Sequence, residues 1–342
     1  MVKRVISNDD GISASFLISI LENLGLSSNI KNSLNLRNID DQFDENLTRN
    51  IYKYFSLFET LSKTAKRLSS LGQNSFGKSL DIQHRMHPEI CEIVSNTVYE
   101  GQLNTHHDHI GHCKETIPFY FEKSNLIDLN SDRAVVWVDI PDKQWGEKLP
   151  AFEKDYANKT ELRIIKEILN NLRCRPRTEP YSIRILSPYV NQVNLINREI
   201  NNKELPKDFI VEDNKSLACT IDSFQGNEAD IIIVSLVRHN GNATMGSALG
   251  FLSDMRRMNV MLSRAVYKMV IVGCFELFSC WQDIIKDKSS LSAVDLEFLG
   301  KFVEFCKPDF KRMKEPPLDN HTKAYTKIGF VSAVNFLGNN DE

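Results

Sequence analysis

Short apolar runs and helically spaced apolar stripes alternate along most of the chain. Continuous apolar runs, which are typical of strands buried on both faces, predict strands at 80–83, 134–140, 183–187, 217–220, 230–237 and 269–272. Apolar residues that recur at helical spacing predict helices at 89–99, 156–172, 190–200, 256–266 and 275–285. Because strands that alternate with helices form a parallel sheet covered on both faces, the pattern predicts an α/β fold.

The two ends of the chain are less regular than its middle. Residues 1–75 combine a predicted strand at 2–6, predicted helices at 16–24 and 51–71, and a polar stretch at 27–50. We therefore expect a helical, loop-rich N-terminal segment at 1–75, a sheet-bearing domain at 76–290 and a C-terminal extension at 291–342. The length of 342 residues is compatible with about two domains.

Composition excludes several classes of protein. With 42% hydrophobic and 25% charged residues, the chain can form a sizeable core, which excludes a disordered or collagen-like protein. Its net charge of −3 excludes a wholly basic, histone-like protein but is compatible with a local basic cleft. The 7 scattered cysteines, without a C-x-x-C pair, and the absence of a membrane-length apolar run predict a cytoplasmic protein with no membrane partner.

Polar residues follow several of the predicted strands. In a parallel α/β sheet, ligands bind outside the carboxyl ends of the strands. The segments 83–88, 187–189 and 220–228 are therefore the first candidates for a binding site.

Four segments of the chain carry a family resemblance. They are LDIQHRMHPEI (80–90), RILSPYVNQ (184–192), ACTIDSFQGNEADIIIVSLVR (218–238) and GFLSDMRRMNVMLSRAVYKMVIVG (250–273). Their order and spacing resemble the second RecA-like domain of superfamily 1 helicases, in the Upf-like group that includes senataxin. The resemblance covers about residues 51–285 and implies a RecA-like, P-loop NTPase-type fold. It implies the C-terminal half of an ATP-dependent nucleic-acid helicase or translocase.

Two arginines are the catalytic candidates that this resemblance implies. Arg85 and Arg264 match the arginines that contact the γ-phosphate of ATP held by the first RecA-like domain. Phosphoryl transfer needs positive charge at the γ-phosphate, and arginine delivers it as a planar fork that stays charged. Arg264 is expected on a helix, on one face with Arg257 seven residues earlier. For any single arginine taken alone, an ordinary surface or salt-bridged role is the alternative.

The resemblance also implies the binding residues for nucleotide and nucleic acid. His84 departs from the tyrosine that is commoner at its position, although an imidazole can still stack. Glu228 matches a residue that holds the ribose hydroxyls, and Gly226 allows the backbone to approach a phosphate closely. The implied nucleotide-binding set is Gln83, His84, Gln225, Gly226, Glu228 and Arg257. The implied nucleic-acid set is Ser187, Pro188, Tyr189, Gln192 and Thr220, whose alternative role is helix capping and loop structure.

One segment matches a nucleotide-binding pattern in the wrong context. GQNSFGKS (72–79) fits G-x-x-x-x-G-K-[ST], but a true P-loop follows a strand and opens a helix. Here a predicted helix precedes it and a predicted strand follows. We therefore expect Lys78 to have no role in ATP binding; an independent NTPase that uses Lys78 is the minor alternative.

The first RecA-like domain of the family is expected to be absent or nearly so, with 1–75 as a remnant of the region between the two domains. ATP and Mg²⁺ would then bind only when a first domain is supplied by a longer gene or by a separate chain. The expected partner is single-stranded DNA or RNA. A non-catalytic nucleic-acid or protein interaction module, derived from a truncated helicase, is the alternative.

A run of histidines remains outside these motifs. HHDHIGHC contains His106, His107, His109, His112 and Cys113, which are residue types that can bind Zn²⁺. The spacing matches no standard zinc finger, and the run is expected in a connecting loop. We predict no metal site, with a metal-binding loop as the open alternative.

Overall fold

The computed structural model describes residues 71, 80–114, 118–122, 133–140, 156–176, 179–200, 205–211, 215–238, 250–279, 293–307 and 328–332. The chain divides into two compact units, Met1–Leu80 and Asp81–Glu342. All elements below belong to the second unit. The expected strand at 2–6, the helices at 16–24 and 51–71 (except residue 71), and the P-loop-like segment with Lys78 lie outside the described residues.

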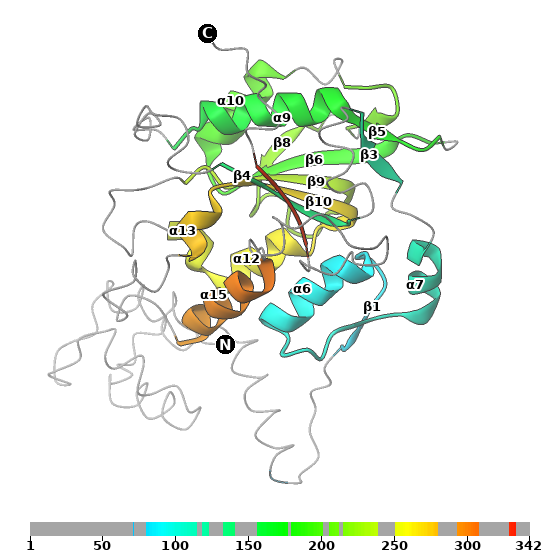
Figure 1. The fold of residues 1–342 in the computed structure, drawn as a ribbon, viewed down its shortest axis with the longest axis vertical. Coiled ribbons are helices and arrows are strands. Elements are labelled where there is room, and N and C mark those ends of the chain that lie inside the picture. Colours follow the sequence, from blue (N-terminus) through cyan, green and yellow to red (C-terminus); the bar gives the residue numbers. More distant parts are fainter. Residues whose placement is uncertain are drawn as a thin grey trace, which may run out of the picture. The chain divides into compact units, whose positions relative to one another are not determined.

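A mostly parallel sheet forms the centre of the second unit (Figure 1). The strand order is β11-β4-β10-β9-β6-β7, and β8 also pairs with β6. All of these pairings are parallel, which confirms the predicted RecA-like α/β fold. The strands are β4 (Val135–Asp139), β6 (Tyr181–Ser187), β7 (Phe209–Ile210), β8 (Ala218–Thr220), β9 (Ala229–Ser235), β10 (Ala265–Gly273) and β11 (Gly329–Ser332).

Helices cover both faces of this sheet (Figure 1). One face carries α9 (Lys159–Asn171) and α10 (Val190–Glu199). The other carries α6 (Pro88–Val98), α12 (Met255–Leu262), α13 (Phe275–Ser279) and α15 (Ala293–Cys306). Because both faces are covered, the central strands are buried at most of their positions, which explains why they are continuous apolar runs in the sequence.

The start of α9 shows how the sequence sets an element boundary. The side chain of Asn158 accepts a hydrogen bond from the backbone N–H of Glu161 at 3.0 Å and caps the helix. The predicted stripe on α9 is buried, and its members are Leu162, Ile165, Ile168 and Leu169. This stripe fixes α9 on the sheet.

Three elements differ from the expectation. The predicted strand at 80–83 is β1 (Ile82–Gln83), which pairs with β2 (Asn104–Thr105) outside the main sheet. The histidine run forms a helix, α7 (His107–Lys114), where a loop was predicted. The predicted helix at 256–266 ends at Leu262, with Ser263 as its C-terminal cap. A second small sheet joins β3 (Phe119–Phe121) to β5 (Leu172–Cys174).

Trp137 lies at the centre of an aromatic cluster in the core. Its side chain is fully buried on β4, and its indole N–H donates to the backbone oxygen of Gly273 at 3.0 Å. The rings of Phe275 and Phe278 meet the indole edge-on at 5.2 and 5.5 Å between centroids, and Phe302 of α15 lies at 6.2 Å. The cluster therefore ties α13 and α15 to the sheet.

The cysteines of the described residues are buried or half-buried free thiols. Burial raises the pKa of Cys274 to about 12, so this thiol is an inert part of the core. Within the described residues, no helix is long and apolar enough to cross a membrane.

Candidate functional site

The predicted site residues occupy two opposite edges of the sheet. Ser187 and Thr220 end β6 and β8, and they are register partners in a parallel pair. Glu228 and Arg264 directly precede β9 and β10. Because the strands are parallel, the first pair lies at the carboxyl edge and the second pair at the amino edge.

The expected location at the carboxyl ends is therefore wrong for part of the predicted site. The segment 83–88 is attached to the beginning of β10, because His87 donates its backbone N–H to the oxygen of Val266 at 2.7 Å. Glu228 directly precedes β9, eight residues after β8 ends at Thr220. Glu228 thus lies at the amino edge with Arg85 and Arg264, whereas Ser187 and Thr220 lie at the carboxyl edge.

Arg85, Glu228 and Arg264 meet at the amino edge. The Nε of Arg85 donates to a carboxylate oxygen of Glu228 in a partly exposed ion pair. Arg264 is held by backbone oxygens: its Nε donates to Val260 at 2.8 Å and its Nη1 to Asn227 at 3.2 Å. The two arginines, 179 positions apart in the sequence (264 − 85), are thus brought to one place.

The electrostatics of this group favour an anion. Burial lowers the pKa of Arg264, and the positive charge of Arg85 lowers it further, whereas Glu228 and Tyr99 raise it. The two guanidinium groups are linked through adjacent residues, because Arg85 pairs with Glu228 and Arg264 donates to the backbone oxygen of Asn227. Two positive groups beside one carboxylate leave an excess of positive charge, which a phosphate group would neutralise.

Gln83 shapes the loop that carries Arg85. Its Nε2 donates to Met86 O at 2.9 Å and to Thr105 Oγ1 at 2.7 Å. Its Oε1 accepts from the backbone N–H groups of Arg85 and Met86 at 2.8 and 2.7 Å. His84, next in the chain, stacks on His106 with ring centroids 4.4 Å apart. In this structure Gln83 positions Arg85, and a contact with the nucleotide base stays a prediction.

The turn between Thr220 and Glu228 contains Gln225 and Gly226. Gly226 has a φ of +90°, and a Cβ at this position would meet no atom within 4 Å. Glycine is thus required by the backbone conformation, and the space beside it is open. The side chain of Gln225 is exposed on the same turn.

Arg257 is fixed separately, on α12. Its Nη2 lies 3.9 Å from Asp222 and its Nε 3.7 Å from Asp254, while its guanidinium carbon lies 4.6 Å from the centroid of Phe251. Since α12 ends before Arg264, the prediction that the two arginines share one helix face is wrong.

At the carboxyl edge, most predicted nucleic-acid residues support the strand ends. Ser187 and Gln192 are fully buried, and the Nε2 of Gln192 donates to Ser235 Oγ at 2.9 Å. Pro188 is half-buried. Thr220 is also half-buried, and its hydroxyl donates to Ser223 Oγ at 2.9 Å. Contact of these residues with single-stranded nucleic acid stays a prediction. Among them, Thr220 is the best placed for such a contact.

A buried carboxyl group that the sequence analysis missed lies beneath this edge. Glu161 is 1% exposed; it accepts hydrogen bonds from Ser235 Oγ and from the backbone N–H of Val237 at 2.8 Å. Burial raises the pKa of Glu161 to about 8, against the lowering effect of these two hydrogen bonds. The N-x-x-E capping spacing from Asn158 was the available sequence signal.

An aromatic cluster, of which the sequence analysis named only Tyr189, lies above this network. The rings of Tyr156 and Tyr189 stack with centroids 4.9 Å apart and an interplanar angle of 11°. The guanidinium of Arg238 lies 5.3 and 5.4 Å from the two centroids, and its Nε donates to the hydroxyl of Tyr189. We call Tyr156, Tyr189 and Arg238 the tyrosine–arginine cluster.

The raised pKa of Glu161 makes stability depend on pH. In the folded chain the pKa of Glu161 is about 8, above its ordinary value of 4.5. Protonated Glu161 therefore stabilises the folded state, and this stabilisation is complete below pH 4.5. It is lost as pH rises towards the folded-state value, at up to ~1.4 kcal/mol per pH unit. We expect Glu161→Gln, which stays neutral, to remove this loss in urea unfolding between pH 5 and 8.5. An unchanged pH slope in the variant would contradict the assignment.

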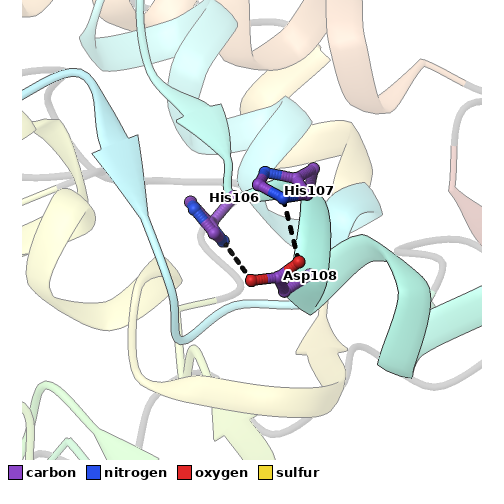
Figure 2. Close-up of side chains that lie close together, drawn as sticks. All are labelled: His106, His107 and Asp108. Atoms are coloured by element: carbon purple, nitrogen blue, oxygen red, sulfur yellow. Dashed lines mark ion pairs between the residues drawn. The ribbon is translucent and has the colours of Figure 1, made fainter.

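The histidine run divides into two groups in the structure. His106 and His107 lie beside Asp108 (Figure 2), with N–O distances of 3.6 and 2.9 Å, and the donor atoms of these three residues all lie within 4.8 Å of one another. His109 and Cys113 instead contact each other at 3.6 Å. The side chain of His112 is not among those that the structure describes. The other four predicted candidates do not converge on one point. The absence of a metal site stays a prediction.

Comparison with known proteins finds a matching family model and several similar proteins. A family model described as an AAA domain matches residues 54–276. The regulator of nonsense transcripts 1 homolog of Neurospora crassa is 29% identical over 252 residues, which are 71% of this chain and 21% of that protein. The ATP-dependent helicase NAM7 of Saccharomyces cerevisiae is 33% identical over 223 residues, 64% of this chain and 20% of the relative.

A relative whose name refers to DNA replication matches a comparable share of the chain. The DNA replication ATP-dependent helicase/nuclease DNA2 of Xenopus laevis is 28% identical over 220 residues, 60% of this chain and 20% of the relative. The chain therefore spans about a fifth of the length of these curated relatives.

Proposed function

Because the chain belongs, over residues 54–276, to the superfamily 1 Upf1-like helicases, we propose that it acts as the C-terminal half of an ATP-dependent motor on nucleic acid. The observation that carries this proposal is the placement of Arg85 and Arg264 beside Glu228 at one sheet edge: Arg85 pairs with Glu228, and Arg264 donates to the backbone oxygen of the preceding residue, Asn227. Two arginines at one edge can supply positive charge to a phosphate held by another domain. The first RecA-like domain would come from the same protein or from a separate chain.

In this proposal Arg264 is the rigid member of the arginine pair. Its hydrogen bonds to the backbone oxygens of Val260 and Asn227 hold the guanidinium without neutralising it. It is therefore ready to stabilise the charge that spreads over the γ-phosphate oxygens during transfer. ATP, with Mg²⁺, would be held mainly by the first RecA-like domain.

Arg85 is the adjustable member. To contact a phosphate, its guanidinium exchanges the carboxylate of Glu228 for a phosphate oxygen. The ion pair is partly exposed, with side chains 37% and 52% accessible, and such pairs contribute only about 0–1 kcal/mol, so the exchange costs little. The released Glu228 can then accept hydrogen bonds from ribose hydroxyls, while Gln225 and Gly226 lie on the adjoining turn.

The nucleic-acid part of the proposal concerns the carboxyl edge. We propose that single-stranded DNA or RNA runs past Thr220, whose hydroxyl can hydrogen-bond a backbone phosphate without reading a base. Such binding is salt-sensitive and indifferent to sequence. The buried free thiols support a reducing compartment, and the cytoplasm is part of the proposal.

ATP hydrolysis by two proteins tests the proposal: this chain alone, and this chain fused to the first RecA-like domain of a relative such as NAM7. We expect little ATP turnover from the chain alone, and ATP turnover that single-stranded nucleic acid stimulates from the fusion. Lys78→Ala should leave the turnover of the fusion unchanged. Turnover by the chain alone that Lys78→Ala abolishes would contradict the proposal and favour an independent NTPase. Binding of single-stranded nucleic acid by a fusion that does not hydrolyse ATP would instead favour the alternative of a non-catalytic interaction module.

A further inference from the structure

The tyrosine–arginine cluster presents one ring to solvent. Tyr156 is 43% exposed, whereas Tyr189 is half-buried, with its ring stacked on that of Tyr156. The outer surface of the stack therefore belongs to Tyr156. Tyr189, a member of the implied nucleic-acid set, is thus covered on one ring face by its neighbour.

Arg238 supports the stack from within the protein. It is 7% exposed, and its guanidinium lies at nearly equal distances from both ring centroids. A Cβ at Gly250 would lie 2.6 Å from its Nη2, so only glycine allows this close approach. A buried cation beside two rings holds the rings in place.

The backbone beneath the cluster adopts unfavourable conformations. Tyr156 has a φ of +53° and Val237, next to Arg238, a φ of +68°. For such residues the left-handed region is unfavourable, and strain of this kind clusters at ligand-binding sites. It is stabilised by buried hydrogen bonds, because Val237 donates its N–H to Glu161 at 2.8 Å and accepts from Asn158 Nδ2 at 3.1 Å.

The cluster lies on the same edge as Thr220. Tyr189 follows the end of β6 by two residues, and Ser187 at that end is the register partner of Thr220. Arg238 follows the end of β9, the strand next to β6. An exposed ring and a phosphate-binding hydroxyl along one edge are the combination that binds a single strand without sequence preference.

From this geometry we propose that Tyr156 is a stacking platform for a base of single-stranded nucleic acid, and that Tyr189 and Arg238 hold the platform in its binding orientation. This inference rests on the proposed function and names the residue that contacts the bases. If Tyr156 is such a platform, the affinity of the chain for single-stranded nucleic acid depends on the bases as well as on the phosphates.

Fluorescence anisotropy with the full chain tests this inference. The probes are labelled oligothymidylate, oligouridylate and an abasic oligodeoxynucleotide of equal length, each titrated at low and high salt. We expect Tyr156→Ala to weaken binding of the two base-containing probes about 5- to 150-fold, the range of one base–aromatic contact. Tyr156→Phe should retain the affinity, and binding of the abasic probe should not change in either variant.

Two matched variants separate the possible outcomes. Tyr120→Ala removes another exposed tyrosine, which is 39% accessible on β3, and should bind like the unmodified chain. Thr220→Val removes the hydroxyl and should weaken all three probes. If Tyr156→Ala binds the base-containing probes normally while Thr220→Val does not, the platform is refuted and the proposed function stands. If the unmodified chain binds no probe at either salt concentration, both proposals are wrong.

Discussion

Replacing Arg264 with alanine lowers ATP turnover by about 10³-fold or more in the fusion with a first RecA-like domain, the scale of an arginine that stabilises phosphoryl transfer. The loss should appear in kcat, whereas nucleotide affinity changes much less, since most ground-state contacts lie on the other domain. Arg264→Lys keeps the charge but loses the planar fork, so we expect it to recover little of the activity. Steady-state kinetics at saturating ATP provides the measurement.

A structural contribution of Arg264 has to be separated from its catalytic one. Its hydrogen bonds to Val260 and Asn227 join the end of α12 to the start of β9, and losing them costs about 1 kcal/mol each. Thermal unfolding of each variant sets the temperature at which kinetics are compared. Arg198→Ala removes an arginine with a 70% exposed side chain and serves as the matched control. Unchanged turnover in Arg264→Ala would remove this arginine from the site.

Trp137→Ala destabilises the folded chain by about 3–5 kcal/mol, the usual cost of removing a large buried aromatic side chain. The indole is fully buried; alanine would leave a cavity between β4, α13 and α15 and would remove the hydrogen bond that the indole N–H donates to the backbone oxygen of Gly273. The loss equals a large part of the stability of an ordinary domain. The change in the urea midpoint measures this loss.

Trp137→Phe provides the comparison for this prediction. It keeps a ring against Phe275 and Phe278 but loses the hydrogen bond to Gly273, so we expect a smaller loss than with alanine. Tyr120→Ala, at an exposed aromatic position, should cost less than about 1 kcal/mol. A midpoint for Trp137→Ala close to that of the unmodified chain would show that α15 does not depend on this cluster.

The central strands were predictable because their environment leaves a local signature. β4, β9 and β10 are buried on both faces, and this burial imposes uninterrupted apolar runs. The helix α9 was predictable for a related reason, because its stripe faces the sheet. The strand order was not predictable, since no local pattern states that β10 lies between β4 and β9.

The site was predictable only as far as the family motifs reach. The motifs selected Arg85 and Glu228, which form an ion pair across 143 sequence positions. They did not reveal Glu161 or Arg238, because burial of a carboxyl group and packing of a guanidinium against rings depend on distant segments. The boundary between α12 and β10 was also wrong, because apolar residues continue through it.

The strand β11 has a consequence for shortened versions of the protein. It is the last described strand along the chain, and it is an outermost strand of the sheet, where it pairs with β4 from Val136 to Asp139. A chain that ends before residue 328 would leave β4 with a row of unpaired N–H and C=O groups. Such a row is a template for edge-to-edge association between copies. Solubility of a shortened chain thus depends on a segment remote from every site residue, and recombinant versions should retain β11.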